Sequence, residues 1–450
     1  MDEQPTVYQI FTPATPANLV FIEREDINNN LVNSLRTPGK QLVIYGHSGT
    51  GKSTIINKKL EQLFESQITT RCMQGMSFEQ IVLDAFDQLS PYYSAEKADK
   101  KTTTKGANLS ATYLGIQSQI SGLTATERAD KSARILPPQL TLQNLARFMG
   151  QSKSCWILED FHKIAETDRT KLSQAMKVFV DMSAEYPDLK IIAIGAVDSA
   201  RQVVQYDNEM RTRAAEIHVP LMNIYELQDI IIKGSKLMNL KFDSSLTTTI
   251  SHYAAGLPSI CHTLCLNICL HLNLEAPSGT PLTINKKSLE PAIKMYLDGA
   301  SDTLKMAFET NLKQAKIKKY NNAELIVKAL SELPQEGATR ADIFKRITRN
   351  ERGYPQGNLT KYLKQMCETS SIPLIRSSES SGKYAFIDPL YRAFAIALNS
   401  STQSNLNHEL IDWNTAIENF VKSFNTDELT KSITGRFQSF TIDHKAFQRE

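Results

Sequence analysis

The sequence predicts an α/β fold in which a parallel sheet carries helices on both faces, followed by further helices and a small domain that ends in a β-hairpin. Three observations predict it. A glycine-rich turn at 46–51 joins an apolar run to a helical pattern. Two further apolar runs, at 155–158 and 191–194, have the length and character of buried strands. Beyond residue 320, three helical patterns precede two short strand patterns.

The glycine-rich turn has the chemistry of a phosphate cradle. Its glycines allow backbone conformations that are closed to residues with a Cβ, so successive N–H groups can point inward around an anion at a helix N-terminus. Lys52 is expected to reach the β- and γ-phosphates, and the Ser53 hydroxyl is expected to be a ligand of Mg²⁺. We therefore expect ATP or ADP with Mg²⁺. The predicted nucleotide-binding residues of this turn are Gly46, His47, Ser48, Gly49, Thr50, Gly51, Lys52, Ser53 and Thr54.

Length and composition limit the other possibilities. A chain of 450 residues allows two to four domains, and its 41% apolar and 22% charged residues are ordinary for a globular protein. The net charge is only +3, so the chain as a whole is not a polycation. Residues 1–5 lack the basic and apolar segments of a signal peptide, and no stretch reaches the ~18 apolar residues of a membrane span. We expect a soluble, cytoplasmic protein that has no membrane partner.

The segments around the turn are predicted as follows. Residues 1–19 are rich in Pro and Thr and are expected to form an extended N-terminal arm. A hydrophobic-Arg-Glu segment at 21–27, which contains Arg24, then leads into a helix. After the turn and its helix, 68–72 is a candidate strand and 78–89 is a candidate helix.

Three segments are expected to interrupt or follow the folded parts. Residues 92–138 are polar and rich in Thr, Ser, Ala and Lys, which marks an insertion; a β-hairpin on a mobile arm and a disordered loop are equal alternatives. Residues 275–281 are rich in Pro, Gly and Ser and form the clearest linker. Residues 399–450 are a polar tail with one helical pattern, at 410–420.

The second chemical motif is an apolar strand that ends in carboxylates. Glu159 and Asp160 follow it at the C-terminal edge of the predicted sheet. Hydrolysis of a Mg-nucleotide needs one carboxylate to hold the metal through its water shell and one to orient and deprotonate the attacking water. Glu159, with Ser53, is assigned to the metal, and Asp160 to the water. A shift by one residue would give the metal to Asp160 instead.

Two arginines form a third candidate element. Arg211 and Arg213 precede an Ile-His-Val-Pro-Leu segment at 217–221, which leads into a helix at 224–237. An arginine that projects toward the γ-phosphate of a neighbouring subunit stabilises transition-state charge only in the oligomer, so it links assembly to hydrolysis. Arg213 is the first choice for this role and Arg211 the second. A plain surface salt bridge is the alternative.

Over residues 20–398, these motifs together resemble the P-loop ATPases of the AAA+ and STAND families. The resemblance implies a P-loop NTPase core at 20–222, a helical lid at 223–276, and slow hydrolysis of ATP to ADP and phosphate. It places Arg24 at the adenine side and the 92–138 insertion where such ATPases carry elements for partner contact.

A Gly-Leu-Pro segment favours the STAND side of this resemblance. In those proteins the proline, here Pro258, packs on the adenine face, and many members hold ADP tightly and work as switches. Two features depart from the family patterns. The carboxylates stand in the order Glu-Asp, and the strand at 190–196 ends without a polar sensor residue, the nearest being Asp198 and Ser199.

The six cysteines give no sign of a disulfide framework or a zinc ribbon, because none forms a C-x-x-C pair. Cys261, Cys265 and Cys269 recur every four residues, which aligns them on one face of a helix. A metal site there is an alternative, but small apolar residues on a packed helix account for the spacing. We treat them as part of the core.

Residues 285–398 are predicted to form a helical linker and a winged helix, because three helices followed by a β-hairpin are typical of that domain. The exit from the hairpin also resembles winged-helix domains that follow archaeal STAND-type ATPase modules. The expected helices are 323–333, 340–348 and 359–367, and the expected strands are 373–376 and 383–387.

The winged helix carries a local excess of positive charge. Residues 313–364 hold twelve Lys or Arg against five Asp or Glu, a net charge of +7. This enrichment fits contact with the phosphates of duplex DNA. A solvated basic face, on a domain that packs against the ATPase and locks its ADP state, is the alternative. The candidate DNA-binding residues are Lys345, Arg346, Arg349, Lys361 and Lys364.

Three functional hypotheses follow. The first is an ATP-binding and slowly ATP-hydrolysing switch that forms a homo-oligomer and engages a separate effector protein, as in a bacterial anti-phage defence system. The second is a DNA-binding initiator or loader that uses its winged helix on duplex DNA. The third is a catalytically weak ATP-binding scaffold, motivated by the Glu-Asp order and the missing sensor.

Overall fold

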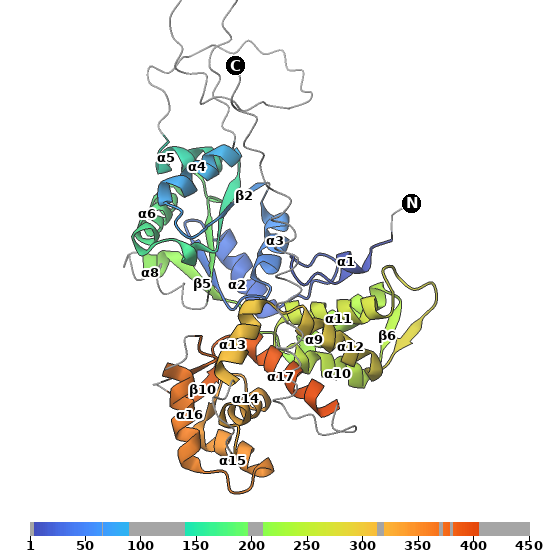
Figure 1. The fold of residues 1–450 in the computed structure, drawn as a ribbon. Coiled ribbons are helices and arrows are strands. Elements are labelled where there is room, and N and C mark those ends of the chain that lie inside the picture. Colours follow the sequence, from blue (N-terminus) through green and yellow to red (C-terminus); the bar gives the residue numbers. More distant parts are fainter. Residues whose placement is uncertain are drawn as a thin grey trace, which may run out of the picture. The chain divides into compact units, whose positions relative to one another are not determined.

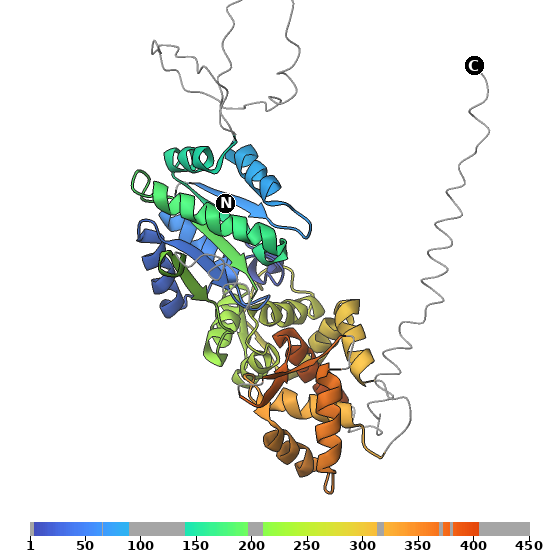
Figure 2. The same cartoon turned by 90° about the vertical axis from the view of Figure 1, so that its left-hand side faces the viewer.

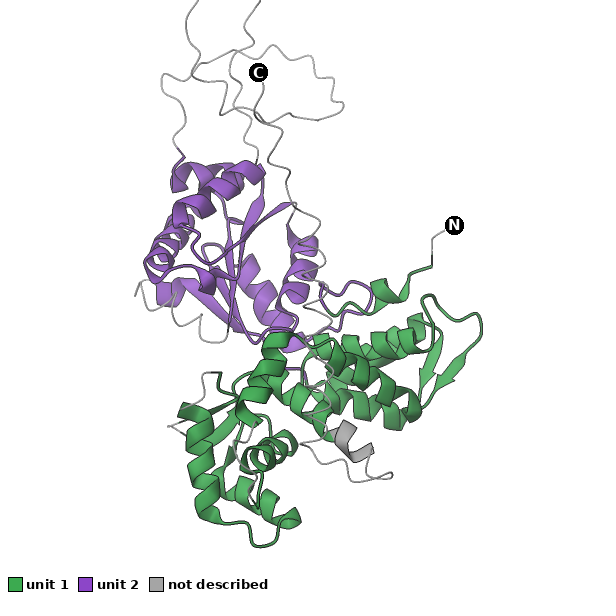
Figure 3. Cartoon of the chain, in the orientation of Figure 1, with its two compact units in different colours: residues 1–13, 223–450 green, residues 14–222 purple. Residues whose placement is uncertain are grey.

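The computed structural model describes residues 4–64, 66–89, 140–196, 210–312, 319–368, 372–378 and 381–404. The chain divides into two compact units (Figure 3). Residues 14–222 form one, which we call the α/β unit, and residues 1–13 with 223–450 form the other, which we call the helical unit. The predicted insertion at 92–138 and most of the predicted tail lie outside the described residues, as do Asp198 and Ser199.

The α/β unit is built on a five-stranded parallel sheet with the strand order β2-β3-β4-β1-β5. The central strands are buried along almost their whole length, which explains why the sequence shows continuous apolar runs rather than alternation. The predicted α/β P-loop fold is confirmed. The strands are β1 (Gln41–Tyr45), β2 (Ser66–Arg71), β3 (Ser154–Glu159), β4 (Ile191–Gly195) and β5 (Ala214–His218).

Helices cover both faces of this sheet, as the α/β unit in Figure 2 shows. Leu42, Ile44 and Ile157 pack with α2 (Glu25–Arg36) and α3 (Lys52–Leu63) on one face. Val43 and Trp156 pack on the other face with three further helices. Alternate residues of each strand therefore point to opposite helical layers. The helices of the second layer are α4 (Phe78–Leu89), α5 (Leu142–Gln151) and α6 (Glu166–Met182).

The first part of the helical unit is a group of packed helices (Figure 1). Cys261, Cys265 and Cys269 are buried in it, and burial raises the pKa of Cys269 to about 12. They are core residues, and within the described residues no group of three or more His, Cys, Asp or Glu could hold a metal ion. The elements are α9 (Ile224–Leu237), β6 (Leu240–Phe242), α10 (Ser244–Tyr253), α11 (Pro258–His271), β7 (Leu282–Ile284), η2 (Lys286–Ser288) and α12 (Leu289–Asp298).

The N-terminal arm differs from its prediction. The sequence predicts an extended arm over residues 1–19, whereas residues 4–13 include the short helix α1 (Val7–Ile10) and pack in the helical unit. The Phe11 side chain is completely buried, and a Cβ at Gly234 would lie 2.3 Å from its ring. The Thr12 backbone N–H donates to Nδ1 of His262 at 3.1 Å. The apolar residues Val7, Ile10 and Phe11 are the reason, because their burial outweighs the extended preference of the flanking prolines.

The predicted linker at 275–281 is also partly structured. The Ser278 backbone N–H donates to the Met238 carbonyl at 3.0 Å, and the Asn239 side chain donates to the Ser278 carbonyl at 2.7 Å. Strands β6 and β7 pair in parallel on either side of this segment. The segment forms bends rather than a helix, and these hydrogen bonds tie it to the rest of the helical unit.

The last part of the helical unit has two helices, a short strand, two more helices, a β-hairpin and a final helix, in that order along the chain (Figure 1). A two-residue strand, β8, was not predicted; it pairs with β10 and extends the hairpin to a three-stranded antiparallel sheet. In the described part of the chain, no helix is both long enough and apolar enough to cross a bilayer. The elements are α13 (Asp302–Leu312), α14 (Asn322–Glu332), β8 (Ala338–Thr339), α15 (Arg340–Asn350), α16 (Gln356–Glu368), β9 (Ile375–Ser378), β10 (Lys383–Phe386) and α17 (Pro389–Ser404).

Candidate nucleotide-binding site

The glycine-rich turn lies between β1 and α3, at the C-terminal edge of the sheet. Gly49 and Gly51 have φ values of 76° and 88°, in the left-handed region that favours glycine. Gly46 is required for a different reason, because a Cβ there would lie 2.4 Å from the Val219 carbonyl oxygen. The buried Thr50 hydroxyl donates to the His47 carbonyl at 2.9 Å and closes the turn. Ser48 is exposed at its outer side.

Lys52 folds back over this turn. Its ammonium donates to the carbonyls of Gly46 at 2.9 Å and His47 at 2.8 Å. Partial burial lowers the pKa of Lys52, and the nearby Asp160 carboxylate acts in the opposite direction. The Lys52 ammonium therefore lies beside the backbone groups of the turn, where it could bind the phosphates of a nucleotide.

The sheet brings Ser53 and Glu159 together across 106 positions of sequence. The Ser53 Oγ lies 3.4 Å from the Glu159 Oε1. Glu159 is the last residue of β3, and its odd-numbered neighbours Cys155 and Ile157 point to the α3 side, so Glu159 points there too. A hydroxyl and a carboxylate oxygen are ligands that Mg²⁺ prefers, so these residues fit the metal.

Asp160 lies one residue beyond the strand, in a left-handed conformation with φ 56°. Its half-exposed carboxylate accepts a hydrogen bond from Lys163 at 2.7 Å. The Nδ1 of His162 is buried and has no hydrogen-bond partner among the described residues, and burial lowers the pKa of this imidazole. The two carboxylates thus have different surroundings, with Glu159 beside Ser53 and Asp160 in the turn that follows.

Arg24 is 7% exposed and holds the backbone together near this edge. Its guanidinium donates to the carbonyls of Pro220 at 2.9 Å and Leu221 at 3.3 Å. It thereby joins the start of α2 to the segment that follows β5. Contact between Arg24 and an adenine stays a prediction.

Two contacts at the site were missed by the sequence reasoning. The Ala17 backbone N–H donates to the Thr54 Oγ1 at 3.3 Å, which places the segment around Ala17 beside the first turn of α3. Nothing in the Pro- and Thr-rich composition of that segment indicates the contact. The stacking of His218 on Tyr45, at 5.0 Å between ring centroids, was also missed, because it depends on the pairing of β1 with β5.

Arg211 and Arg213 lie at the opposite edge of the sheet from the glycine-rich turn. They belong to α8 (Met210–Arg213), which leads directly into β5. Ala214 is paired with Gln41 at the start of β1, whereas His218 is paired with Tyr45 beside the turn. The Arg213 Nη1 lies 3.9 Å from the Asp181 Oδ1, and its side chain is 40% exposed. Arg211 is exposed.

Pro258 is the first residue of α11, in the helical unit. It follows Ala255 and Gly256, which have φ values of 48° and 80°. The backbone turn and the proline at the first helical position account for the local sequence without a ligand. Its contact with an adenine stays a prediction.

The candidate DNA-binding residues lie on two neighbouring helices, α15 and α16, and two of them form ion pairs. Arg346 forms a half-buried ion pair with Glu332, so its guanidinium is not the exposed cation that the sequence predicts for DNA binding. Lys364 lies 3.8 Å from Glu368 on the same helix. The exposed candidates are Lys345, Arg349, Lys361 and Lys364.

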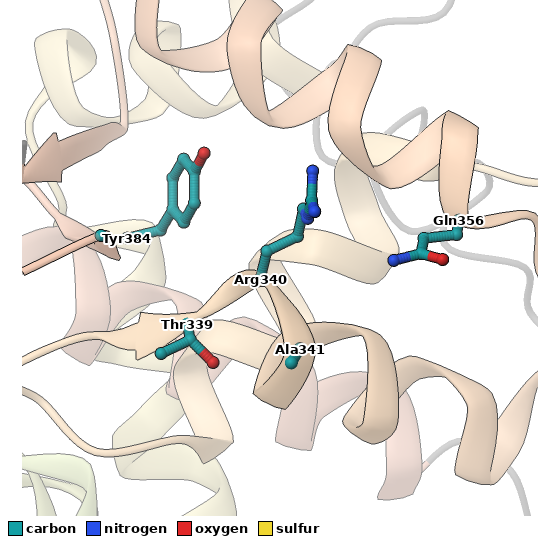
Figure 4. Close-up of a pocket in the computed structure, with 6 residues that line it drawn as sticks. Thr339, Arg340, Ala341, Gln356 and Tyr384 are labelled. Atoms are coloured by element: carbon teal, nitrogen blue, oxygen red, sulfur yellow. The ribbon is translucent and has the colours of Figure 1, made fainter.

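A shallow hollow opens beside these helices (Figure 4). Arg340, Gln356 and Tyr384 point toward it from α15, α16 and β10. The Arg340 Nη1 also donates to the Thr360 Oγ1 at 3.2 Å. These residues were absent from the predicted set, although the exposed Arg340 at a helix start was a readable signal.

Comparison with solved structures finds P-loop ATPases. The Walker-type ATPase PABY2304 of Pyrococcus abyssi aligns with 84% of this chain and 96% of its own, at 14% identity and a TM-score of 0.48. The Aeropyrum pernix ORC1 protein, solved in complex with DNA, aligns over 90% and 100% at 10% identity and a TM-score of 0.41. The Thermotoga maritima RuvB Holliday junction branch migration motor aligns over 83% and 94% at 11% identity and a TM-score of 0.38.

These similarities do not assign an activity or a partner to this chain, because the identities and TM-scores are low. No family model matches the sequence. No curated protein matches it either.

Proposed function

We propose that this chain binds MgATP in its α/β unit and hydrolyses it slowly, as a switch whose nucleotide state controls self-assembly. The observation that carries the proposal is the meeting of Ser53 and Glu159 at 3.4 Å beside Lys52, on a turn whose three glycines are each required by geometry. A glycine-rich turn that binds no nucleotide would have no reason to lie next to a carboxylate from another strand.

The residues divide the chemistry between them. The backbone N–H groups of the turn and the Lys52 ammonium bind and orient the phosphates. Ser53 and Glu159 would hold Mg²⁺, which supplies charge neutralisation between the phosphates when it is bound. Asp160 is assigned to the attacking water; Lys163 holds its Oδ2, and its other carboxylate oxygen can accept the proton.

The two arginines, Arg211 and Arg213, are the residues that would link ATP binding to assembly. Five residues of β5 separate Arg213 from the edge that carries Lys52, about 16 Å at the rise of a strand, so Arg213 is not placed to serve its own site. A partly exposed arginine at the opposite edge is suited to complete the site of a second copy, where it would exchange Asp181 for a phosphate. This supports Arg213, and next Arg211, as residues that complete the site in a homo-oligomer.

The mass of the full chain tests this proposal. Mass photometry with ADP, with ATP and Mg²⁺, and with no nucleotide should show larger assemblies only with ATP and Mg²⁺. Lys52→Ala should remove the response, and Arg213→Ala should retain ATP binding while losing growth and turnover. A wild-type protein that stays monomeric with ATP and every effector tried would refute the switch.

Two further parts of the proposal depend on that result. A separate effector protein, as in anti-phage defence, would be found by co-purification with the ATP-bound assembly and not with Lys52→Ala. Turnover that Asp160→Asn lowers by about 100-fold would establish hydrolysis by this site. Retained ATP binding without any wild-type turnover would favour a catalytically weak scaffold.

A second candidate function is binding of duplex DNA by the last part of the helical unit, used as a winged helix. The observation that favours it is the cluster of exposed cations on α15 and α16, next to a hollow into which Arg340 points. Adding duplex DNA to the mass measurement separates the candidates. Growth only when DNA and ATP are both present would favour an initiator or loader.

A further inference from the structure

Arg71 lies at the edge of the candidate nucleotide site, outside the motifs considered so far. It is the last residue of β2, and Glu159, the last residue of β3, is its register partner. Register partners on neighbouring parallel strands point to the same face of a sheet, so both side chains lie on the α3 side. The Arg71 Nε lies 3.4 Å from the Glu159 Oε2.

Both oxygens of the Glu159 carboxylate are therefore engaged. Ser53 approaches Oε1, and Arg71 approaches Oε2. The Glu159 side chain is 27% exposed, whereas that of Arg71 is 83% exposed. An ion pair with one well-exposed partner is weak, so the guanidinium can leave the carboxylate without disturbing the core.

We propose that Arg71 is a positioning residue that holds the Glu159 carboxylate and competes with Mg²⁺ for it. This rests on the proposed function, in which Glu159 and Ser53 hold the metal. A carboxylate that is shared with a guanidinium attracts a divalent cation less strongly, because part of its charge is already compensated. Arg71 thus raises the Mg²⁺ concentration at which the site binds MgATP.

The test measures binding rather than turnover. Fluorescence of a methylanthraniloyl ATP analogue is followed at fixed protein concentration while MgCl₂ is added, for the full chain and three variants. For Arg71→Ala, the Mg²⁺ concentration at half-maximal signal should fall about two- to fivefold. Arg71→Lys should stay near the wild-type value because it keeps the charge. Binding of the analogue in EDTA should be the same in the wild type and in both Arg71 variants.

Three results would overturn the positioning role. An unchanged Mg²⁺ midpoint in Arg71→Ala would show that the pair does not affect the metal. Weaker binding in EDTA would mean that Arg71 contacts the phosphates directly. A lower thermal unfolding midpoint together with weaker binding would assign it a structural role.

The same titration separates this inference from the proposed function. Lys52→Ala gives the baseline of a site that cannot hold the phosphates. If the wild type does not exceed this baseline with Mg²⁺, the proposed nucleotide site is refuted, whatever Arg71 does.

Discussion

The α/β unit and the helical unit place their chemically important residues in different ways. In the α/β unit, parallel strands end at one edge, so Ser53 and Glu159 meet although they are 106 positions apart. In the helical unit, the cations of α15 and α16 lie on helical surfaces, and Arg346 is already paired with Glu332. The end of a parallel strand fixes where a side chain lies. On a helical surface, residue type alone does not show whether a charge is available.

The largest expected effect tests whether the N-terminal arm belongs to the helical unit. Phe11→Ala removes a completely buried ring that packs against Gly234. We expect it to lower the free energy of unfolding of the helical unit by about 3–5 kcal/mol, the usual cost of truncating a buried Phe. Hydrogen exchange of the α11 amides in the full chain measures the change.

Tyr8→Ala is the matched control for that variant. Tyr8 lies on the same short helix but is 53% exposed, so its truncation should change the free energy by less than about 0.5 kcal/mol. Equal effects of the two variants would show that the arm does not dock through Phe11.

The second prediction concerns acid. Burial lowers the pKa of His262 to about 4, and its Nδ1 accepts the Thr12 N–H, which a protonated ring cannot do. The unfolded state binds this proton near pH 6.5 and the folded state does not. Stability from the neutral ring is therefore complete above about pH 6.5 and is lost as the pH falls toward 4, by on the order of 3 kcal/mol.

Hydrogen exchange of residues 4–13 at pH 7.5 and pH 5 measures this loss, after correction for the intrinsic rate. His262→Gln keeps a hydrogen-bond acceptor but does not titrate. In this variant the protection of residues 4–13 should therefore change less with pH. An arm equally protected at both pH values in the wild type would contradict the prediction.

Sequence and structure agree best where one physical constraint dominates. The turn at 46–51 and the continuous apolar runs predicted the α/β fold correctly. Few other structures explain a phosphate-binding turn next to fully buried strands. The prediction for the N-terminal arm was wrong because Pro and Thr indicate only a local preference for extended backbone. The burial of Phe11 depends on tertiary contacts, which composition does not show. The pairing of Arg346 with Glu332 was invisible for a similar reason, since the two lie on different helices.

The third prediction compares two glycines, one from each unit. Gly46→Ala would bring a Cβ to 2.4 Å from the Val219 carbonyl, and backbone must move to relieve it. A distortion costing about 1–3 kcal/mol would weaken nucleotide binding by roughly 5- to 150-fold. Gly357→Ala is the control, because no atom lies within 4 Å of the added Cβ. Isothermal titration with MgATP should show an unchanged affinity for it, and a normal affinity of Gly46→Ala would contradict the assigned role of the close approach.

The prediction with the smallest expected effect compares an exposed cation with an ion-paired cation in the helical unit. If the last part of this unit binds duplex DNA, Lys345→Ala should remove one phosphate contact and reduce the slope of log affinity against log salt by about 0.9. Arg346→Ala should leave that slope unchanged and instead lower thermal stability, because it leaves the half-buried Glu332 without its cation. Fluorescence anisotropy over a range of salt concentrations measures both slopes. An equal reduction for Arg346→Ala would mean that the ion pair opens on DNA, so that even a paired helical cation can be recruited by a polyanion.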